Sequence, residues 1–497
     1  MDIKELQKKP PYGMIAILFI GAFIAFLNNT LLNVALPTIM AEFDVKPSLV
    51  QWLTTGYMLV NGILMPASAF FIQRFTNRGL FITAMSLFSL GTLLAIIAPE
   101  FYILVIARMI QAMGSAMMMP LLMNIMLTSF PVERRGSAMG MFGLVMITAP
   151  AIGPTLSGWV VEHYTWRTLF EIILPLSLLI LIYSIFRLKN ITPVKKVHLD
   201  VFSLVLSTIG FGGLLYGFSF AGDAGWSNPL VYGSISIGAI GVILFVLRQL
   251  RMDEPLLEFR IYKYPMFALS SVISVIFSVA MFSAMILTPL YVQIVRGTSP
   301  FHAGLMMLPG AIIMAIMSPI TGRLFDKYGA KTLAIVGLTI TVVTTYMMSS
   351  TFDMDASYTY IVSLFTIRAF GMSMIQMPVM TNGMNQLPLS ANPHGTAVNN
   401  TLNQVSGAIG SALLLTAMDK HTARKGEELA AEAMQNADPN LSADALLQLK
   451  EQITLQATLD GIQYSFLIAT IISAIALVLA FFIKRVTPPK TDELLRP

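Results

Sequence analysis

The sequence has 497 residues, of which 56% are hydrophobic and only 11% are charged, and its formal net charge is +5. Soluble domains carry about 25% charged residues, so this composition excludes an ordinary soluble protein and favours a membrane protein. The absence of cysteine excludes disulfides and thiolate metal sites. The small positive charge does not indicate a nucleic-acid partner.

Apolar segments long enough to cross a bilayer follow one another along almost the whole chain. A spanning helix needs about 20 mostly apolar residues. The long apolar run near 369–418 holds two spans, because the Pro-rich segment 385–395 predicts a turn between them. We predict fourteen spans, near residues 12–36, 49–72, 79–98, 101–126, 136–161, 168–186, 201–221, 229–247, 264–295, 301–322, 332–352, 356–385, 394–418 and 461–483.

The basic residues predict the side of the membrane on which each loop lies. Lys and Arg concentrate in cytoplasmic loops. An even number of spans puts both termini on one side, and placing them in the cytoplasm assigns most of the 31 Lys and Arg residues to cytoplasmic segments. Residues 419–460, between the last two spans, are polar and of mixed charge. We predict that they form an extracellular, partly helical loop.

The two ends of the chain resemble each other after a shift of 253 residues. Pro66 then falls on Pro319, and Gln73 falls on Asp326. Each pair lies where one helix ends, a basic turn follows and the next helix begins. Spans nine to fourteen are therefore predicted to repeat spans one to six in the same orientation.

This repeat predicts the fold and the domain boundaries. Arg108 in span four corresponds to Arg368 in span twelve, which supports the same pairing of the halves. Parallel six-helix halves are one known plan for transporters. We predict an all-α polytopic membrane protein with two parallel six-helix bundles plus two insert helices. The boundaries are 1–190 for the first bundle, 191–260 for the insert and 261–497 for the second bundle.

Two motifs resemble signatures of the major facilitator superfamily. GRLFDKYGAK at 322–331 resembles its G-x-L-x-D-R-x-G-R-K loop motif and lies in the expected place, between helices two and three of a half. RMIQAMG at 108–114 resembles its helix-four motif R-x-x-Q-G/A-x-G. This resemblance implies the major facilitator fold, with a substrate cavity between the two bundles.

Two further motifs resemble fourteen-span drug:proton antiporters of that superfamily. Gly153, Pro154 and Gly158 in GPTLSG resemble the helix-five antiporter motif G-P-x-x-G-G, and LNNTLLNVALP at 27–37 resembles the helix-one motif L-D-x-T-I-V-N-V-A-L-P. The resemblance is greatest to the lincomycin-resistance-like branch. It implies a bacterial cell-membrane protein, and the antiporter motif implies a bend that lets the halves rock.

The chain departs from these patterns at three positions. Asn28 stands where the helix-one motif has an aspartate, Gln73 stands where the first-half loop motif has one, and Ala69 replaces the glycine that begins that loop motif. The complete loop motif therefore lies in the second half, and the usual proton-carrying carboxylate of helix one is missing.

An inner-gate motif is expected in the two basic turns. The charged residues of the second turn are predicted to close the cytoplasmic face, with the carboxylate of Asp326 attracted by the N-terminus of the helix that starts near Ala330. The alternative is that these residues serve only the orientation of the protein, which would not require Asp326. The motif comprises Arg74, Arg78, Gly322, Arg323, Asp326 and Lys331.

Charged residues within spans are costly and mark functional positions. Arg108 is predicted to face the central cavity and to link proton and substrate binding, with a structural role against backbone carbonyls as the alternative. Glu171 is the one carboxylate within a predicted span and is the second proton-coupling candidate, because partial burial would raise its pKa. Arg167, one turn earlier, could instead pair with it.

Polar residues within spans are the candidates for the substrate cavity. Each could also make an interhelical hydrogen bond. Asn399 and Asn403 share a face of span thirteen, as do Asn400 and Gln404. The candidates are Asn28, Asn29, Asn33, Gln51, Tyr57, Gln111, Gln293, Arg368, Gln376, Asn399, Asn400 and Asn403.

These patterns favour a secondary transporter over an enzyme. No phosphate-binding G-x-x-x-x-G-K-[ST] loop occurs, so ATP does not drive it directly, and no catalytic, cofactor or metal constellation is present. We expect a monomeric, proton-coupled multidrug efflux transporter that exports amphipathic or cationic compounds by alternating access. The alternatives are an exporter of one endogenous metabolite, lipid or signalling nucleotide, and a membrane sensor that does not transport.

Overall fold

A computed structural model describes residues 10–50, 52–191, 194, 200–436 and 443–486. These residues form helices connected by short turns, and no strand occurs among them. The first six long helices are α2 (Tyr12–Phe43), α4 (Trp52–Arg74), α5 (Asn77–Ile96), α6 (Phe101–Ser129), α7 (Arg135–His163) and α8 (Arg167–Arg187). The insert is α9 (Val201–Ala224) and α10 (Pro229–Arg251).

The second half repeats this series. Its helices are α11 (Pro265–Leu290), α12 (Pro300–Tyr328), α13 (Ala330–Thr351), α14 (Tyr358–Ser373), α15 (Gln376–Met384), α16 (Asn392–Asn436) and α17 (Ala443–Ala480). The short elements are α3 (Pro47–Val50), η1 (Val132–Arg134), η2 (Phe259–Lys263), the π-helical turn η3 (Tyr291–Val295) and η4 (Leu389–Ala391).

Twelve helical segments in the described part of the chain are long and apolar enough to cross a membrane, and each coincides with a predicted span. The two remaining predictions, 136–161 and 394–418, are helical as well, in α7 and α16.

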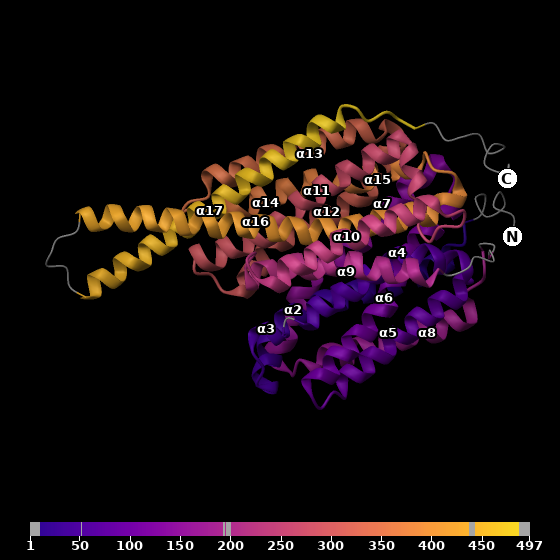
Figure 1. Ribbon diagram of the computed structural model, residues 1–497, viewed down its shortest axis with the longest axis horizontal. Coiled ribbons are helices and arrows are strands. Elements are labelled where there is room, and N and C mark those ends of the chain that lie inside the picture. The colour runs from indigo at the N-terminus through magenta and orange to yellow at the C-terminus, as the bar shows by residue number, and fades with distance from the viewer. Residues whose placement is uncertain (1–9, 51, 192–193, 195–199, 437–442, 487–497) are drawn as a thin grey trace.

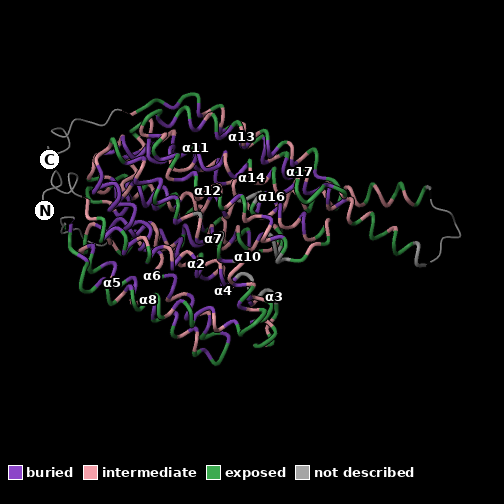
Figure 2. Tube along the Cα trace, turned by 180° about the vertical axis from the view of Figure 1, so that it is seen from behind, coloured by how far each residue is buried: buried purple, intermediate pink, exposed green. Residues whose placement is uncertain are grey.

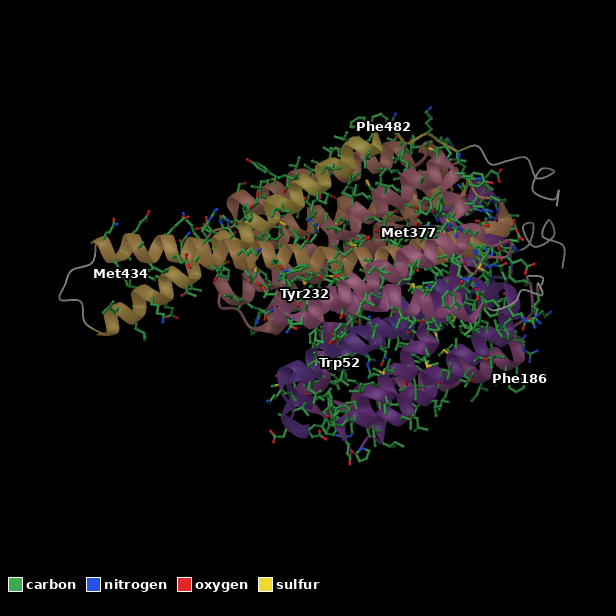
Figure 3. The ribbon with its side chains drawn as sticks, viewed as in Figure 1. Trp52, Phe186, Tyr232, Met377, Met434 and Phe482 are labelled. Atoms are coloured by element: carbon green, nitrogen blue, oxygen red, sulfur yellow. The ribbon has the colours of Figure 1, made fainter. Side chains whose placement is uncertain are left out.

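Phe186 and Phe482 are 80% and 64% exposed and point outward from the bundle (Figure 3). Buried residues fill the interior while exposed ones lie along the outer helices (Figure 2). This is the distribution expected where lipid is the solvent.

The same pairs of helices pack together in both series. In the first, α5 packs between α6 and α8, and α2 packs on α7 and α8. In the second, α13 packs between α14 and α17, and α11 packs on α16 and α17. Helix α9 packs on α10 and on α4 and α16, so the insert contacts both series (Figure 1). The boundaries at residues 190 and 260 stay a prediction.

The start of α2 and the end of α17 lie at the same end of the bundle, as an even number of spans requires (Figure 1). We call it the terminal end. Beyond the opposite end, α16 and α17 continue as a projecting pair of helices (Figure 1). The polar segment 419–460, expected to be partly helical, is helical throughout its described part, because α16 runs on to Asn436 and α17 starts at Ala443. Its Ala, Glu, Lys and Leu residues favour helix; residues 437–442 lie outside the described part.

The predicted span 356–385 is two helices rather than one. Helix α14 ends at Ser373 and α15 begins at Gln376. Pro378 has no N–H to donate to the carbonyl four residues earlier, that of Met374, so the helical bonding fails at this point. Within the first turn of α15 the missing N–H costs nothing, because first-turn N–H groups lack helical partners.

Candidate functional site

A carboxylate joins the two series of helices at the terminal end. Asp326, in the last turn of α12, accepts hydrogen bonds from the backbone N–H groups of Gly136 at 2.9 Å and Ser137 at 3.0 Å, and from the Ser137 hydroxyl at 2.6 Å. These N–H groups belong to the first turn of α7, where they have no helical acceptor and where the helix dipole favours a negative charge. We call this set of bonds the gate contact.

Glycines let α7 and α12 approach closely behind the gate contact. A Cβ atom added to Gly322 of α12 would lie 2.3 Å from the backbone oxygen of Gly136. One added to Gly140 would lie 2.6 Å from the backbone oxygen of Ser318. The Ser318 hydroxyl donates to the Gly140 oxygen at 2.6 Å. Since backbone atoms cannot move aside, only glycine fits at positions 140 and 322 in this arrangement.

Two other contacts join the halves at the same end. Arg135 Nη1 donates to Asn385 Oδ1 at 3.1 Å. Gln73, at the end of α4, lies 2.9 Å from Nε2 of His394 in the first turn of α16. These contacts, the gate contact and the Ser318–Gly140 bond all lie toward the terminal end. The bundle is therefore closed on that side.

The remaining residues of the inner-gate motif hold the turns rather than join the halves. Arg78 Nη2 donates to the Ile185 carbonyl of α8 at 2.7 Å. Arg74, Arg323 and Lys331 are exposed at the terminal end. Arg485, which the sequence did not suggest, donates to the backbone oxygen of Asp326 at 2.9 Å, where a cation suits the carbonyls that end α12.

Arg108 is fully buried within the first series of helices. Its Nη1 donates to Gln111 Oε1 at 2.8 Å, its Nε lies 3.4 Å from the Leu53 oxygen of α4, and its guanidinium lies 4.3 Å from the centre of the Tyr57 ring. Gln111 also accepts from Asn28 at 3.2 Å and donates to Thr92 at 2.7 Å. The charge thus binds α2, α4, α5 and α6 together. Among the described residues no carboxylate bonds to it, and its Nη2 has no partner.

Arg368 occupies the matching place in the second series. Its Nε donates to Thr345 at 3.0 Å and its Nη2 donates to the Ala280 oxygen of α11 at 3.0 Å. Thr345 corresponds to Thr92 under the shift of 253 residues. Both buried arginines therefore tie the equivalent helices together, which is the structural alternative considered for them.

The other cavity candidates differ in their surroundings. Asn399 and Asn403 face α11, where they accept from Ser271 at 3.3 Å and Ser278 at 3.0 Å. Gln376 Oε1 and Asn400 Nδ2 are buried and have no partner among the described residues. Asn29 and Gln293 are half-buried, with Gln293 in η3. Gln51 and the side chain of Asn33 lie outside the described part.

The antiporter motif packs α7 onto α2 within the first series. A Cβ added to Gly153 would lie 2.1 Å from Oγ1 of Thr30. Ser157, where the motif has glycine, donates to the backbone oxygen of Leu31. Gly158 is half-buried, the side chain of Pro154 lies outside the described part, and α7 is continuous through the motif. These contacts set the α2–α7 packing.

Glu171 does not meet the condition expected of a proton carrier. It is exposed on α8, so the expected partial burial is wrong. Arg167 pairs with Glu42 of α2 instead, which also accepts from Trp166 Nε1 at 2.6 Å. Burial alone would raise the pKa of Glu42, but the bonds from Arg167 and Trp166 outweigh it and hold that pKa below its usual value. Arg167 is thus engaged away from Glu171.

Comparison with known proteins agrees with this architecture. The family model for the Major Facilitator Superfamily matches residues 18–411. The chain belongs to the major facilitator superfamily. It is 47% identical to the uncharacterized MFS-type transporter YhcA of Bacillus subtilis, over 98% of this chain and 95% of that one. It is 43% identical to the lincomycin resistance protein LmrB of Bacillus subtilis, over 95% of each chain.

A solved structure supports the fold over nearly the whole chain. The human organic anion transporter MFSD10 (TETRAN) superposes with a TM-score of 0.63 at 12% sequence identity, over 95% of this chain and all of that one. The all-α major facilitator fold is confirmed, and the chain is a multi-pass membrane transporter rather than an enzyme.

Several residues that shape this major facilitator site were not predicted. Ser137 and His394 contact the opposite half but match none of the superfamily motifs. The spacing of Gly136 and Gly140, four residues apart in an apolar segment, was the one available signal, because small residues at this spacing favour close helix crossing.

Proposed function

We propose that this transporter exports amphipathic drugs from the cytoplasm in exchange for protons, as a monomer and by alternating access. The observation that carries the proposal is the near full-length similarity to lincomycin resistance proteins, at 42% and 43% identity. The multidrug transporter MdtP of Bacillus subtilis, at 26% identity over 94% of this chain, supports the same class of function.

The contacts between the halves support alternating access. They gather at the terminal end, which we assign to the cytoplasm from the distribution of Lys and Arg. The arrangement then corresponds to a state closed to the cytoplasm. Alternation requires these contacts to break and re-form in each cycle, so they must be few and polar, as the gate contact and the Gln73–His394 contact are.

Three of the buried polar groups without partners among the described residues are the proposed substrate contacts. Arg108 Nη2, Gln376 Oε1 and Asn400 Nδ2 lie on α6, α15 and α16. Helix α16 packs on α4 and α6, and α15 packs on α7, so these groups lie on helices at the junction of the halves. A few such polar groups among apolar walls would orient varied amphipathic molecules.

The function is tested by expression in a host that lacks its own drug exporters. Expression should protect such cells against several unrelated drugs and dyes, lincomycin among them, and a protonophore should abolish the protection. Absence of protection against the whole panel, at normal amounts in the membrane, would favour the alternative of one endogenous metabolite, lipid or signalling nucleotide.

The orientation is tested with single cysteines in this cysteine-free chain. Met434 is 83% exposed near the tip of the projecting helices (Figure 3), and Ser390 is exposed at the terminal end. With both termini in the cytoplasm, Met434→Cys should react with an impermeant maleimide in intact cells, whereas Ser390→Cys should react only after lysis. The opposite pattern would contradict the orientation.

Replacement of Glu171 tests the remaining carboxylate candidate. Because Glu171 is exposed on α8 and lies outside the contacts between the halves, Glu171→Gln should retain proton-driven efflux. The measurement is substrate-induced proton movement beside efflux in the same vesicles. Loss of both, with the protein present in normal amounts, would restore Glu171 as the proton carrier.

A further inference from the structure

The second contact between the halves has a composition unlike the first. Under the internal repeat, Gln73 at the end of α4 occupies the position of Asp326 at the end of α12. Asp326 meets the first turn of α7, and Gln73 meets His394 in the first turn of α16. An amide and an imidazole thus replace the carboxylate and backbone N–H groups of the gate contact. We call this contact the histidine contact.

Both ring nitrogens of His394 are occupied. Nδ1 accepts the backbone N–H of Glu258 at 3.2 Å, and Nε2 lies 2.9 Å from the Gln73 amide. The Gln73 atom nearest His394 Nε2 is the amide Nε2. An imidazole that accepts at Nδ1 carries its hydrogen on Nε2, so we assign the Gln73 amide with its oxygen toward the ring, because amide oxygen and nitrogen are distinguished only by their hydrogen-bond network. This pair of bonds requires the neutral ring. A proton added at Nδ1 would face the N–H of Glu258 and break that bond.

A cavity beside the ring offers a place for the charged form. It has a volume of about 300 Å³ and lies between the end of α4, the segment 253–258 and the start of α16. Asp253, Glu254 and Glu258 line it together with Gln73 and His394. Glu258 is paired with Arg260 at 3.5 Å. No titratable side chain reaches the cavity from α4 or η4 among its lining residues.

The two environments favour different forms of His394. In the histidine contact, the acceptor role of Nδ1 and the positive end of the α16 dipole both disfavour a charged ring. Turned into the cavity, a charged ring would lie among Asp253, Glu254 and Glu258, whose negative charges favour it. The ring cannot occupy both places. A protonated His394 therefore cannot keep its hydrogen bond to Gln73.

We propose that His394 is a proton-sensing residue of the transport cycle: the neutral ring holds α16 against α4, and protonation from the terminal side releases them. This inference rests on the proposed export function and on the cytoplasmic assignment of the terminal end. Histidine is the side chain whose charge changes near neutral pH. Acidification of the cytoplasm then shifts the transporter toward the state open to the cytoplasm, ready to load its substrate.

The test measures the separation of α4 and α16 directly, without transport. Arg74 and Ser390 are exposed on either side of the contact, and the parent chain has no cysteine, so Arg74→Cys with Ser390→Cys carries two spin labels. In lipid nanodiscs, lowering the pH from about 8 to about 5.5 should raise the ratio of separated to closed molecules about fivefold, the factor expected from the loss of one hydrogen bond.

Two variants in this labelled background make the result specific. His394→Gln keeps a donor and an acceptor but cannot titrate, so it should stay closed and lose the response to pH. Gln73→Glu supplies a carboxylate for the charged ring, so the closed population should persist at the lower pH. His302→Gln is the matched control and should respond as the parent does, because His302 lies beside the Ser299 cap at the start of α12, at the opposite end of that helix from Asp326.

The outcomes separate this inference from the proposed function. A parent that does not separate on acidification, or a His394→Gln variant that separates as much as the parent, overturns the inference. If His394→Gln fails to fold, Gln73→Glu decides the question. The inference is overturned if α4 and α16 separate on acidification as much in Gln73→Glu as in the parent. Proton-driven export is measured separately, on the parent alone. If the parent exports without proton coupling, the proposed function fails. The inference about His394 still stands if His394→Gln removes the response to pH.

Discussion

Asp326→Asn is expected to reduce export at least about tenfold, while the protein remains in the membrane in normal amounts. The carboxylate accepts three hydrogen bonds from the start of α7. An asparagine oxygen accepts fewer, and its NH2 group would face N–H donors. A hydrogen bond to a charged group contributes about 1.5–3 kcal/mol, and 1.4 kcal/mol is a factor of ten in an equilibrium. The state closed to the cytoplasm would become rare, and the step that forms this state would slow each transport cycle.

Export by equal amounts of protein measures this effect, and Glu133→Gln is its control. Glu133 is exposed in η1, so its replacement removes a negative charge from the same end without touching the gate contact. Spin labels at Arg134→Cys and Lys327→Cys should show α7 and α12 farther apart in Asp326→Asn alone. Normal export by Asp326→Asn would refute the gate role of this carboxylate.

Gly322→Ala is expected to abolish most export through sterics alone. Its Cβ atom would lie 2.3 Å from the Gly136 oxygen and 3.1 Å from the Gly140 Cα. Because these are backbone atoms, α7 and α12 must separate, and overpacking of this kind costs about 1–3 kcal/mol. The charge of Asp326 is unchanged, so this variant tests the close approach independently of the gate contact.

Gly304→Ala is the matched control on the same helix. No atom lies within 4 Å of a Cβ added there, so this variant should export at the parent rate. Transport assays on the two variants, corrected for the amount of protein in the membrane, make the comparison. Equal rates for both would mean that the α7–α12 approach is not needed for the cycle.

The spans could be predicted from the sequence because hydropathy reports burial in lipid directly. The interval 79–98, for example, became α5 at Asn77–Ile96. Two features escaped this criterion for physical reasons. The projecting helices after residue 418 are helical without being apolar, so only their content of helix-forming residues indicated them. The break before Gln376 depends on Pro378, whose effect on the carbonyl of Met374 is local and independent of hydropathy.

The site was predictable only in part. Asp326 in a basic turn indicated a helix N-terminus as its partner, but the expected helix, which starts near Ala330, was wrong: the N–H groups come from the start of α7. It was not predictable where partners are distant in sequence. Nothing near Gln73 indicates His394, 321 residues away, and nothing near Arg167 indicates Glu42 rather than Glu171. The amide candidates could bond either a neighbouring helix or a substrate, and only packing distinguishes Asn399 from Asn400.

Transport by the purified protein in sealed proteoliposomes, with an imposed pH gradient, tests the proposed function most directly. The substrate is a compound against which expression of this chain protects cells. Uptake into inside-out vesicles should rise when the lumen is acidic, stop when the gradient is collapsed, and be accompanied by protons leaving the lumen. Transport of that compound at the same rate with and without the gradient would contradict a proton-coupled exporter.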